Sequence, residues 1–278
     1  MLYLFLAVLC SAAFSLGTRL SSYRIKSPLG MLVMNYCSCL MIACIRTGSG
    51  NFFPQHEALP FAIASGALQG AFYMIAYILM QTNMKRNGVV LSATFMKLGL
   101  LVPIAVSVFL FGELPSLPQF LGFLMAVGAI VLINTNSSGA TVQFRSLLLL
   151  LLLAAGCGDT MCKIYEEWGD PALEPQFLLY TFVSALVLGL AVMIAKGERP
   201  GKAEIAFGLV LGVPNFFSAK FLLDALEFIP AFIAYPTCNV ATLLLVTLAG
   251  ILFFREKLSR RQGLAIAAIL IALALLNL

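Results

Sequence analysis

The sequence has little charge and few of the residues that soluble proteins use on their surfaces. Only 10% of the 278 residues are charged, and 61% are hydrophobic. Soluble globular proteins carry about 25% charged residues. Water therefore cannot be the main solvent of this chain.

The sequence also lacks the motifs of common enzymes and metal sites. It has no HExxH, GxSxG or phosphate-binding GxxxxGK[ST] motif, and its single histidine, His56, lies in an expected loop. Its seven cysteines all fall in apolar stretches, without the spacing or partners of a zinc site. We therefore expect no enzymatic activity, no metal or other cofactor, no ATP-driven pumping and no nucleic-acid partner, and we interpret the cysteines as small core residues.

Long apolar stretches dominate the chain. A transmembrane helix needs about 20 apolar residues, and the sequence offers ten such stretches. They lie near residues 2–22, 28–46, 58–81, 88–111, 116–135, 144–166, 173–195, 203–226, 230–254 and 259–277. This pattern predicts an all-α integral membrane protein with no separate soluble domain.

Basic residues concentrate on one side of this arrangement. With alternating loops, thirteen Lys and Arg residues fall on one side and only Arg46 on the other. The thirteen are Arg19, Arg24, Lys26, Lys85, Arg86, Arg145, Lys196, Arg199, Lys202, Arg255, Lys257, Arg260 and Arg261. The positive-inside rule places this basic side in the cytoplasm, and it predicts both termini and the acidic loop around residues 166–174 outside.

The two halves of the chain resemble each other. A shift of 143 residues aligns 111–134 with 254–277 at eight identical positions of 24, and four of these are polar. A shift of 142 residues aligns the GxxxG steps at 66–70 and 208–212, which predict close helix packing. Because each half has five crossings, we expect two inverted five-helix repeats, residues 1–138 and 139–278. Inverted repeats are typical of transporters.

These motifs resemble the EamA-like family of the drug/metabolite transporter superfamily. The resemblance rests on Phe111-Gly-Glu and Phe254-Arg-Glu at the ends of the fourth helices, the following Ser-x-x-Gln turns and the small-residue-rich fifth helices. It implies a central cavity lined by helices 1, 3, 4, 6, 8 and 9, with helices 5 and 10 at the periphery. It also implies cytoplasmic termini, whereas the basic residues here predict the reverse.

Two ionisable residues lie deep in predicted spans, where unpaired charges are costly and mark candidate sites. Lys97 lies about 13 Å into the fourth helix at 1.5 Å per residue. It could anchor a carboxylate or phosphate, or it could form a structural ion pair with Asp159. Asp159 in the sixth helix could bind a proton or a cation, or it could pair with Lys163 four residues away.

In the related small multidrug transporters, an acidic residue in the first helix exchanges protons for cations. This chain has no acidic residue there, and Asp159 lies in the corresponding helix of the second repeat. A further pair, Lys220 and Asp224, is four residues apart and is expected to be structural.

Polar and aromatic residues at helical spacing suggest further cavity-lining positions, although such residues also join helices. The candidates for substrate or coupling-ion binding beside Lys97 and Asp159 are Thr94, Tyr73, Asn215, Tyr235, Asn239, Thr242 and Ser15. Three prolines inside helices could be hinges or static kinks: Pro103, Pro214 and Pro236.

The sequence thus predicts a secondary transporter of small organic metabolites or drugs that works by alternating access. We expect an exporter in a bacterial inner membrane, with a small-molecule substrate, membrane lipid and a proton or other coupling ion as partners. The alternatives are a non-transporting membrane sensor or assembly component on the same fold, and an intramembrane enzyme.

Overall fold

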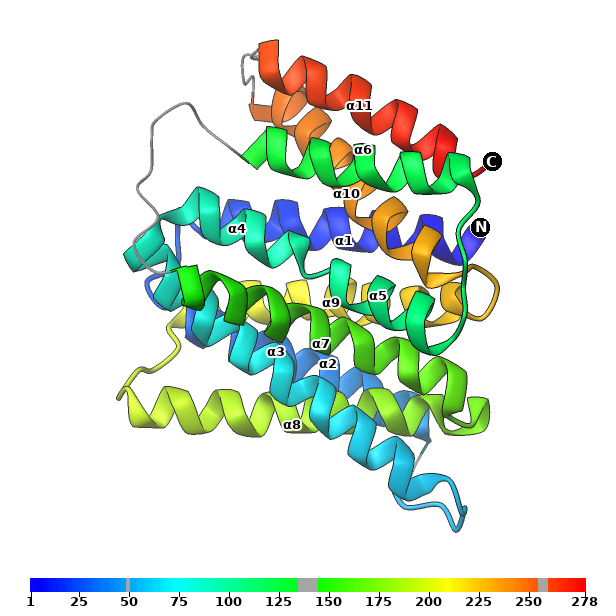
Figure 1. The fold of residues 1–278 in the computed structure, drawn as a ribbon. Coiled ribbons are helices and arrows are strands. Elements are labelled where there is room, and N and C mark those ends of the chain that lie inside the picture. Colours follow the sequence, from blue (N-terminus) through cyan, green and yellow to red (C-terminus); the bar gives the residue numbers. More distant parts are fainter. Residues whose placement is uncertain (49–50, 135–144, 255–259) are drawn as a thin grey trace.

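The computed structural model describes residues 1–48, 51–134, 145–254 and 260–278, and all its regular elements in these ranges are helices (Figure 1). In chain order they are α1 (Leu2–Ser21), α2 (Pro28–Thr47), α3 (Leu59–Asn87), α4 (Val89–Leu98), α5 (Leu101–Leu110), α6 (Leu117–Asn134), α7 (Arg145–Trp168), the short η1 (Pro171–Leu173), α8 (Glu174–Ala195), α9 (Lys202–Leu226), α10 (Ala231–Phe254) and α11 (Arg260–Leu276).

The length and apolarity of these helices match a membrane. Eight segments of the described chain are long and apolar enough to span it, with α4 and α5 counted together as Leu91–Leu110. The apolar parts of α6 and α11 are shorter, Leu117–Leu132 and Gly263–Leu276. Large hydrophobic side chains such as Phe109 and Val210 are exposed on outer faces, where lipid can solvate them. The protein is a multi-pass integral membrane protein.

Most predicted spans agree with the helices to within two residues, but the third and fourth differ. The third helix continues to Asn87, six residues beyond the expected end, and stops at Gly88, whose φ of 84° suits glycine. The expected helix 88–111 is broken between α4 and α5. The proposed boundary at residues 138 and 139 lies outside the described residues, as do Arg255 and Lys257.

The break between α4 and α5 follows from proline chemistry and from packing. Pro103 has no N–H to donate to the carbonyl of Gly99, so the regular helical ladder is interrupted there. Gly99 instead lies against Gly156 of α7, and a Cβ on Gly156 would be 2.4 Å from the Gly99 carbonyl oxygen. The backbone between α4 and α5 therefore touches the backbone of α7 two residues after Lys97.

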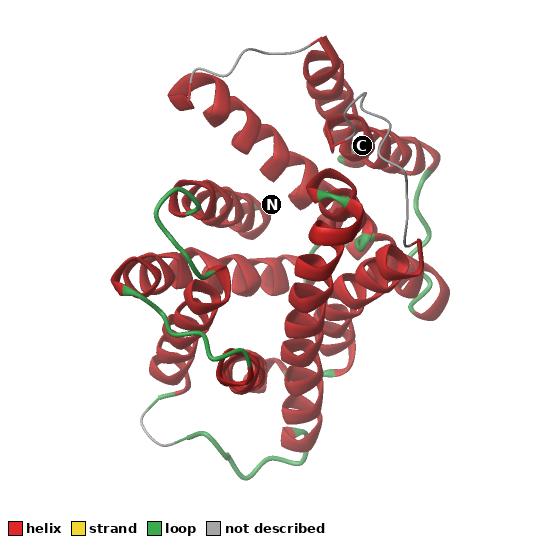
Figure 2. Ribbon diagram, turned by 90° about the vertical axis from the view of Figure 1, so that its left-hand side faces the viewer, coloured by secondary structure: helices red, strands yellow, loops and turns green. Residues whose placement is uncertain are grey.

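Both chain ends lie at the same end of the bundle (Figure 1). We call the end with Met1 and Leu278 the terminal end, and the opposite end, with the basic loops, the basic end. Helix α8 packs against both α2 and α3, and α2 also packs against α9, with α1 packed on α9 and α7 on α3. Helices α6 and α11 pair with each other along one flank (Figure 1). Figure 2 shows that the described chain consists of helices joined by loops.

Glycines set the closest helix approaches, as the GxxxG steps predict. A Cβ on Gly70 of α3 would lie 2.1 Å from the carbonyl oxygen of Thr181 in α8. A Cβ on Gly212 of α9 would lie 2.6 Å from the carbonyl oxygen of Asn35 in α2. Any larger residue would force these backbones apart, so the glycines fix how the first half packs on the second.

Candidate functional site in the centre of the bundle

Lys97 lies at the C-terminal end of α4, directly before the helix break. Its Nζ donates a hydrogen bond to Oδ1 of Asn239 on α10, at 3.3 Å, and its side chain remains exposed. The Nδ2 of Asn239 donates to the carbonyl oxygen of Tyr235 one turn earlier, at 3.1 Å. The amide is therefore oriented by its own helix to present its oxygen to the ammonium group.

Asp159 lies on α7 beside two tyrosines. The hydroxyl of Tyr235 on α10 donates to the Asp159 backbone oxygen at 2.7 Å. The ring of Tyr73 on α3 packs against Gly158, where a Cβ would lie 3.1 Å from ring atoms. Because Gly158 has no side chain, the Tyr73 ring can pack directly against the residue that precedes Asp159. The Tyr73 hydroxyl accepts from Gln69 at 3.0 Å.

Lys97 and Asp159 are close enough to interact electrostatically. They do not form the ion pair considered from the sequence, because the described residues contain no salt bridge within 4.0 Å between them. The Lys97 ammonium group donates a hydrogen bond to Asn239 instead. The two charges come from different helices, α4 and α7, and remain available to a third group.

The expected pair of Asp159 with Lys163 is wrong. Lys163 is 1% exposed, and its Nζ lies 2.7 Å from Glu113, 2.6 Å from Glu166 and 2.6 Å from Glu167. On α7, the Lys163 ammonium therefore pairs with Glu166 and Glu167, three and four positions later, and not with Asp159, four positions earlier. The structural pair of Lys220 and Asp224 is confirmed, with two contacts of 2.7 Å.

The remaining candidates divide between this centre and other interfaces. Thr94 and Thr242 are 3% and 5% exposed on α4 and α10, the helices of Lys97 and Asn239. The Ser15 hydroxyl donates to the Ser11 backbone oxygen of its own helix at 2.8 Å. Asn215 is placed elsewhere, because its Nδ2 donates to Oδ1 of Asn35 at 2.7 Å and joins α9 to α2.

The three candidate hinge prolines lie in three different helices. Pro103 is the third residue of α5, and Pro214 and Pro236 lie inside α9 and α10. Pro236 immediately follows Tyr235, one turn before Asn239. Because Pro236 has no N–H, a backbone carbonyl one turn earlier in α10 lacks its usual helical donor beside the site.

Glu113 is a connecting residue that the sequence interpretation missed. Besides contacting Lys163, its Oε2 accepts from the Ala231 backbone N–H at 2.8 Å and from the Ser107 hydroxyl. It thereby joins the loop after α5 to α7 and to the N-terminus of α10. The sequence did contain a sign of this role, because Glu113 belongs to the Phe-x-Glu motif that both halves of the chain share.

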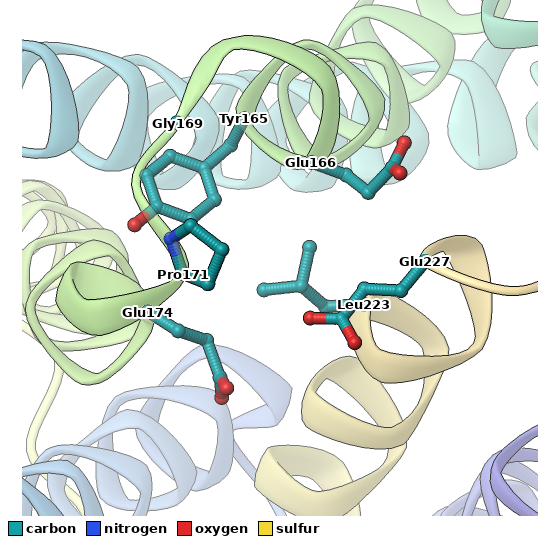
Figure 3. A pocket seen from close by; sticks show the side chains of 7 residues that line it. All are labelled: Tyr165, Glu166, Gly169, Pro171, Glu174, Leu223 and Glu227. Atoms are coloured by element: carbon teal, nitrogen blue, oxygen red, sulfur yellow. The ribbon is translucent and has the colours of Figure 1, made fainter.

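A separate pocket of about 380 Å³ opens at the terminal end (Figure 3). Three carboxylates from different elements surround it: Glu166 of α7, Glu174 of α8 and Glu227 after α9. Tyr165 forms another wall and donates its hydroxyl to the Asp170 backbone oxygen at 2.7 Å. None of the predicted site residues lines this pocket, so it is distinct from the central cluster.

No group of three or more His, Cys, Asp or Glu side chains in the described ranges has the arrangement of a metal site. The seven cysteines are all free, and three of them, Cys39, Cys162 and Cys238, are buried. The central cluster therefore offers one ammonium, one carboxylate and neutral amide, hydroxyl and phenol groups. This set can bind charged and polar groups without a covalent step.

Comparison with known proteins matches this picture. The chain is 25% identical over 279 residues to an uncharacterised protein of Haemophilus influenzae, covering 95% of this chain and 93% of that protein. A crystal structure with 17% sequence identity superposes with a TM-score of 0.73, covering 99% of this chain and 94% of the other, which shows the same fold.

The model of the EamA-like transporter family matches residues 145–278, which include Asp159, Tyr235 and Asn239. The family resemblance inferred from the sequence is thus confirmed. Members of this family are transporters rather than enzymes. Residues 145–278, from α7 to α11, belong to the EamA-like transporter family of the drug/metabolite transporter superfamily.

Proposed function

We propose that this protein is a secondary transporter that carries small organic metabolites or drugs across a membrane by alternating access. Lys97 and Asp159 form the centre of its binding site. Tyr73, Tyr235 and Asn239 hold or flank these two charges, and Thr94, Thr242 and Ser15 extend the polar lining. Asn215, which bonds to Asn35, acts in the packing of α9 on α2.

The observation that carries this proposal is the pair of unneutralised charges. Lys97 comes from the first half of the chain and Asp159 from the second, and both lie about midway along their membrane-spanning segments. Ionisable groups at this depth are costly, and they are found where they serve a pathway or a ligand. Lys97 contacts the neutral amide of Asn239 rather than the Asp159 carboxylate, which leaves both charged groups free to bind solute or coupling ion.

The helix contacts support two inverted repeats, residues 1–138 and 139–278. In such an arrangement α1, α2 and α3 correspond to α7, α8 and α9. Helix α3 packs on α8 and α2 on α9, which are equivalent contacts after exchange of the halves. The pairs α1–α9 and α7–α3 are equivalent in the same way, and α6–α11 is equivalent to itself. Halves related in this manner can exchange conformations about a fixed central site.

The two charges define the chemistry of the solute. Lys97 suits a carboxylate or phosphate group, whereas Asp159 suits an amine or a coupling proton. The break after Lys97 adds the N-terminus of α5, whose dipole favours a negative group nearby.

The proposed orientation places the basic end in the cytoplasm and the terminal end outside. The excess of Lys and Arg in the basic loops supports this direction. A bacterial inner membrane is the proposed location, and export is the proposed direction of transport.

The test is a thermal-shift screen of the purified protein against amino acids, organic acids, sugar phosphates, nucleosides and quaternary amines. A solute at 100 times its Kd should add about 2.7 kcal/mol of stability. Solutes that stabilise the protein are then loaded into proteoliposomes, and exchange of labelled solute is measured in both directions. Lys97→Ala and Asp159→Asn should abolish the stabilisation by the relevant class.

The matched control is the double variant Lys220→Ala/Asp224→Ala, which removes two membrane-embedded charges that pair with each other. Lys220 also lies 3.3 Å from Glu174, and Glu174 keeps Arg46 as a partner at 3.9 Å. It should keep solute-dependent stabilisation and exchange. Stabilisation without exchange would favour a sensor or assembly role over transport. Recovery of a chemically altered solute would favour an enzyme.

A further inference from the structure

We propose that the ion pair between Glu113 and Lys163 is a latch that closes the terminal end of the central site and must open for solute to pass there. This inference rests on the proposed alternating-access function, and it assigns a role to residues that the solute site does not use.

The position of Lys163 places it between the site and the terminal end. It lies one turn beyond Asp159 on α7, in the direction of Trp168. Three aromatic side chains toward the terminal end from Asp159 or Asn239 are also buried: Tyr165, Phe232 and Tyr235 are 3%, 4% and 1% exposed. Lys97, in contrast, has an exposed side chain. The packed layer between the site and the terminal end therefore includes the Lys163 ammonium.

The latch joins the two halves of the chain. Glu113 follows α5 in the first half, while Lys163 on α7 and the Ala231 N–H of α10 belong to the second. The Phe111 ring adds to the junction, because its centroid lies 5.6 Å from the Lys163 Nζ and its edge contacts Trp168 at 5.5 Å between centroids. One carboxylate thus holds α5, α7 and α10 together at the terminal end.

The three carboxylates around Lys163 differ in what they connect. Glu166 and Glu167 are on the same helix as Lys163 and move with it. Of the three, only Glu113 comes from outside α7, in the loop that follows α5. When α5 and α7 separate, Lys163 loses one partner and keeps two, so no buried ammonium is left unpaired. Such a contact can break and re-form during a transport cycle.

The test measures access to Cys238 from the terminal end, without requiring transport. Cys238 is 7% exposed on α10, and its thiol interacts with the Lys97 charge. A variant that keeps only this cysteine is reconstituted in sealed vesicles, and a membrane-impermeant methanethiosulfonate reagent is added. Vesicles are sorted by the protease accessibility of a C-terminal tag, which marks the terminal end.

Glu113→Gln keeps an oxygen that can accept from Ala231 but removes the charge that holds Lys163. We expect the modification rate from the terminal end to rise at least tenfold. Glu166→Gln is the matched control, because it removes an equally close carboxylate of similar exposure from the same ammonium, at 14% against 17%. Its rate should stay within about twofold of the parent, and Glu113→Asp should restore a low rate.

Equal rates in Glu113→Gln and the parent would overturn the latch, as would equal increases in Glu113→Gln and Glu166→Gln. If Glu113→Gln does not fold, Ser107→Ala tests the same contact, because the Ser107 hydroxyl donates to Glu113. It should raise the rate about threefold, and an unchanged rate would contradict the proposal. A raised rate in a protein that moves no solute would support the latch and reject the transport function.

Discussion

The Lys97 ammonium contacts Oδ1 of Asn239 at 3.3 Å, although Asp159 lies near enough to interact with it electrostatically. An amide oxygen satisfies a hydrogen bond of the ammonium without neutralising its charge. The charge of Lys97 therefore remains available to a ligand, as does that of Asp159. This relationship gives the central site its proposed function and leads to the first prediction.

Lys97→Arg should bind solute better than Lys97→Ala, because it retains the positive charge, but less well than the parent. For a solute with a carboxylate or phosphate, loss of one charge-assisted contact of about 1.5 to 3 kcal/mol weakens affinity about tenfold to a hundredfold. Titration calorimetry on the purified variants measures this order. Equal affinities in all three proteins would remove Lys97 from the binding site.

Asn239→Leu should weaken solute binding less than Lys97→Ala. Loss of the amide frees the ammonium to approach Asp159, and the two charges would then neutralise each other. We expect Asn239→Leu/Asp159→Asn to bind an anionic solute more tightly than Asn239→Leu alone. The same calorimetric titration, with the single variant as reference, checks this, and an identical affinity would argue against competition between Asp159 and the solute.

Gly70→Ala should destabilise the protein by about 1 to 3 kcal/mol, the usual cost of overpacking. The added Cβ would lie 2.1 Å from the Thr181 carbonyl oxygen, and this contact involves backbone that cannot turn aside. Gly128→Ala is the matched control in another apolar helix, since a Cβ there has nothing within 4 Å. The apparent melting temperature in detergent should fall for Gly70→Ala alone.

Lys163→Met should destabilise the protein by about 3 kcal/mol, because it leaves three carboxylates together without their cation. Glu167→Gln should cost under about 1 kcal/mol, since Glu167 is 32% exposed and water can replace the contact. Thermal unfolding of the two variants in one detergent gives the comparison. A loss no greater for Lys163→Met than for Glu167→Gln would show that the buried cluster contributes little.

Phe53→Cys and Tyr23→Cys should report the orientation in the membrane. Both positions are exposed, at 73% and 76%, in loops at the terminal and basic ends. In a cysteine-free parent expressed in intact cells, an impermeant maleimide should label Phe53→Cys and spare Tyr23→Cys. The reverse result would place the termini in the cytoplasm.

Most positions of the helices could be predicted from the sequence alone, because a run of about 20 apolar residues has the length and composition of a membrane-spanning helix. Seven of the ten predicted stretches have boundaries within one residue of the helices observed. The close approaches at Gly70 and Gly212 could also be predicted, since a GxxxG step places two small residues on one helix face. The excess of Lys and Arg in one set of loops can likewise be counted without knowledge of the fold.

The partners of the buried charges depended on the tertiary structure. Spacing along α7 allowed Lys163 to pair with Asp159, Glu166 or Glu167, and it gave no information on Glu113, 50 positions earlier in the chain. Asn215 has the polarity of a cavity residue, yet it faces Asn35 because α9 packs on α2 along that side. Helix spacing limits which residues share a face, whereas the rotation and neighbours of each helix decide what that face contacts. The sequence therefore determined which segments enter the membrane, and packing between segments decided that Lys97 contacts Asn239 in the neighbourhood of Asp159.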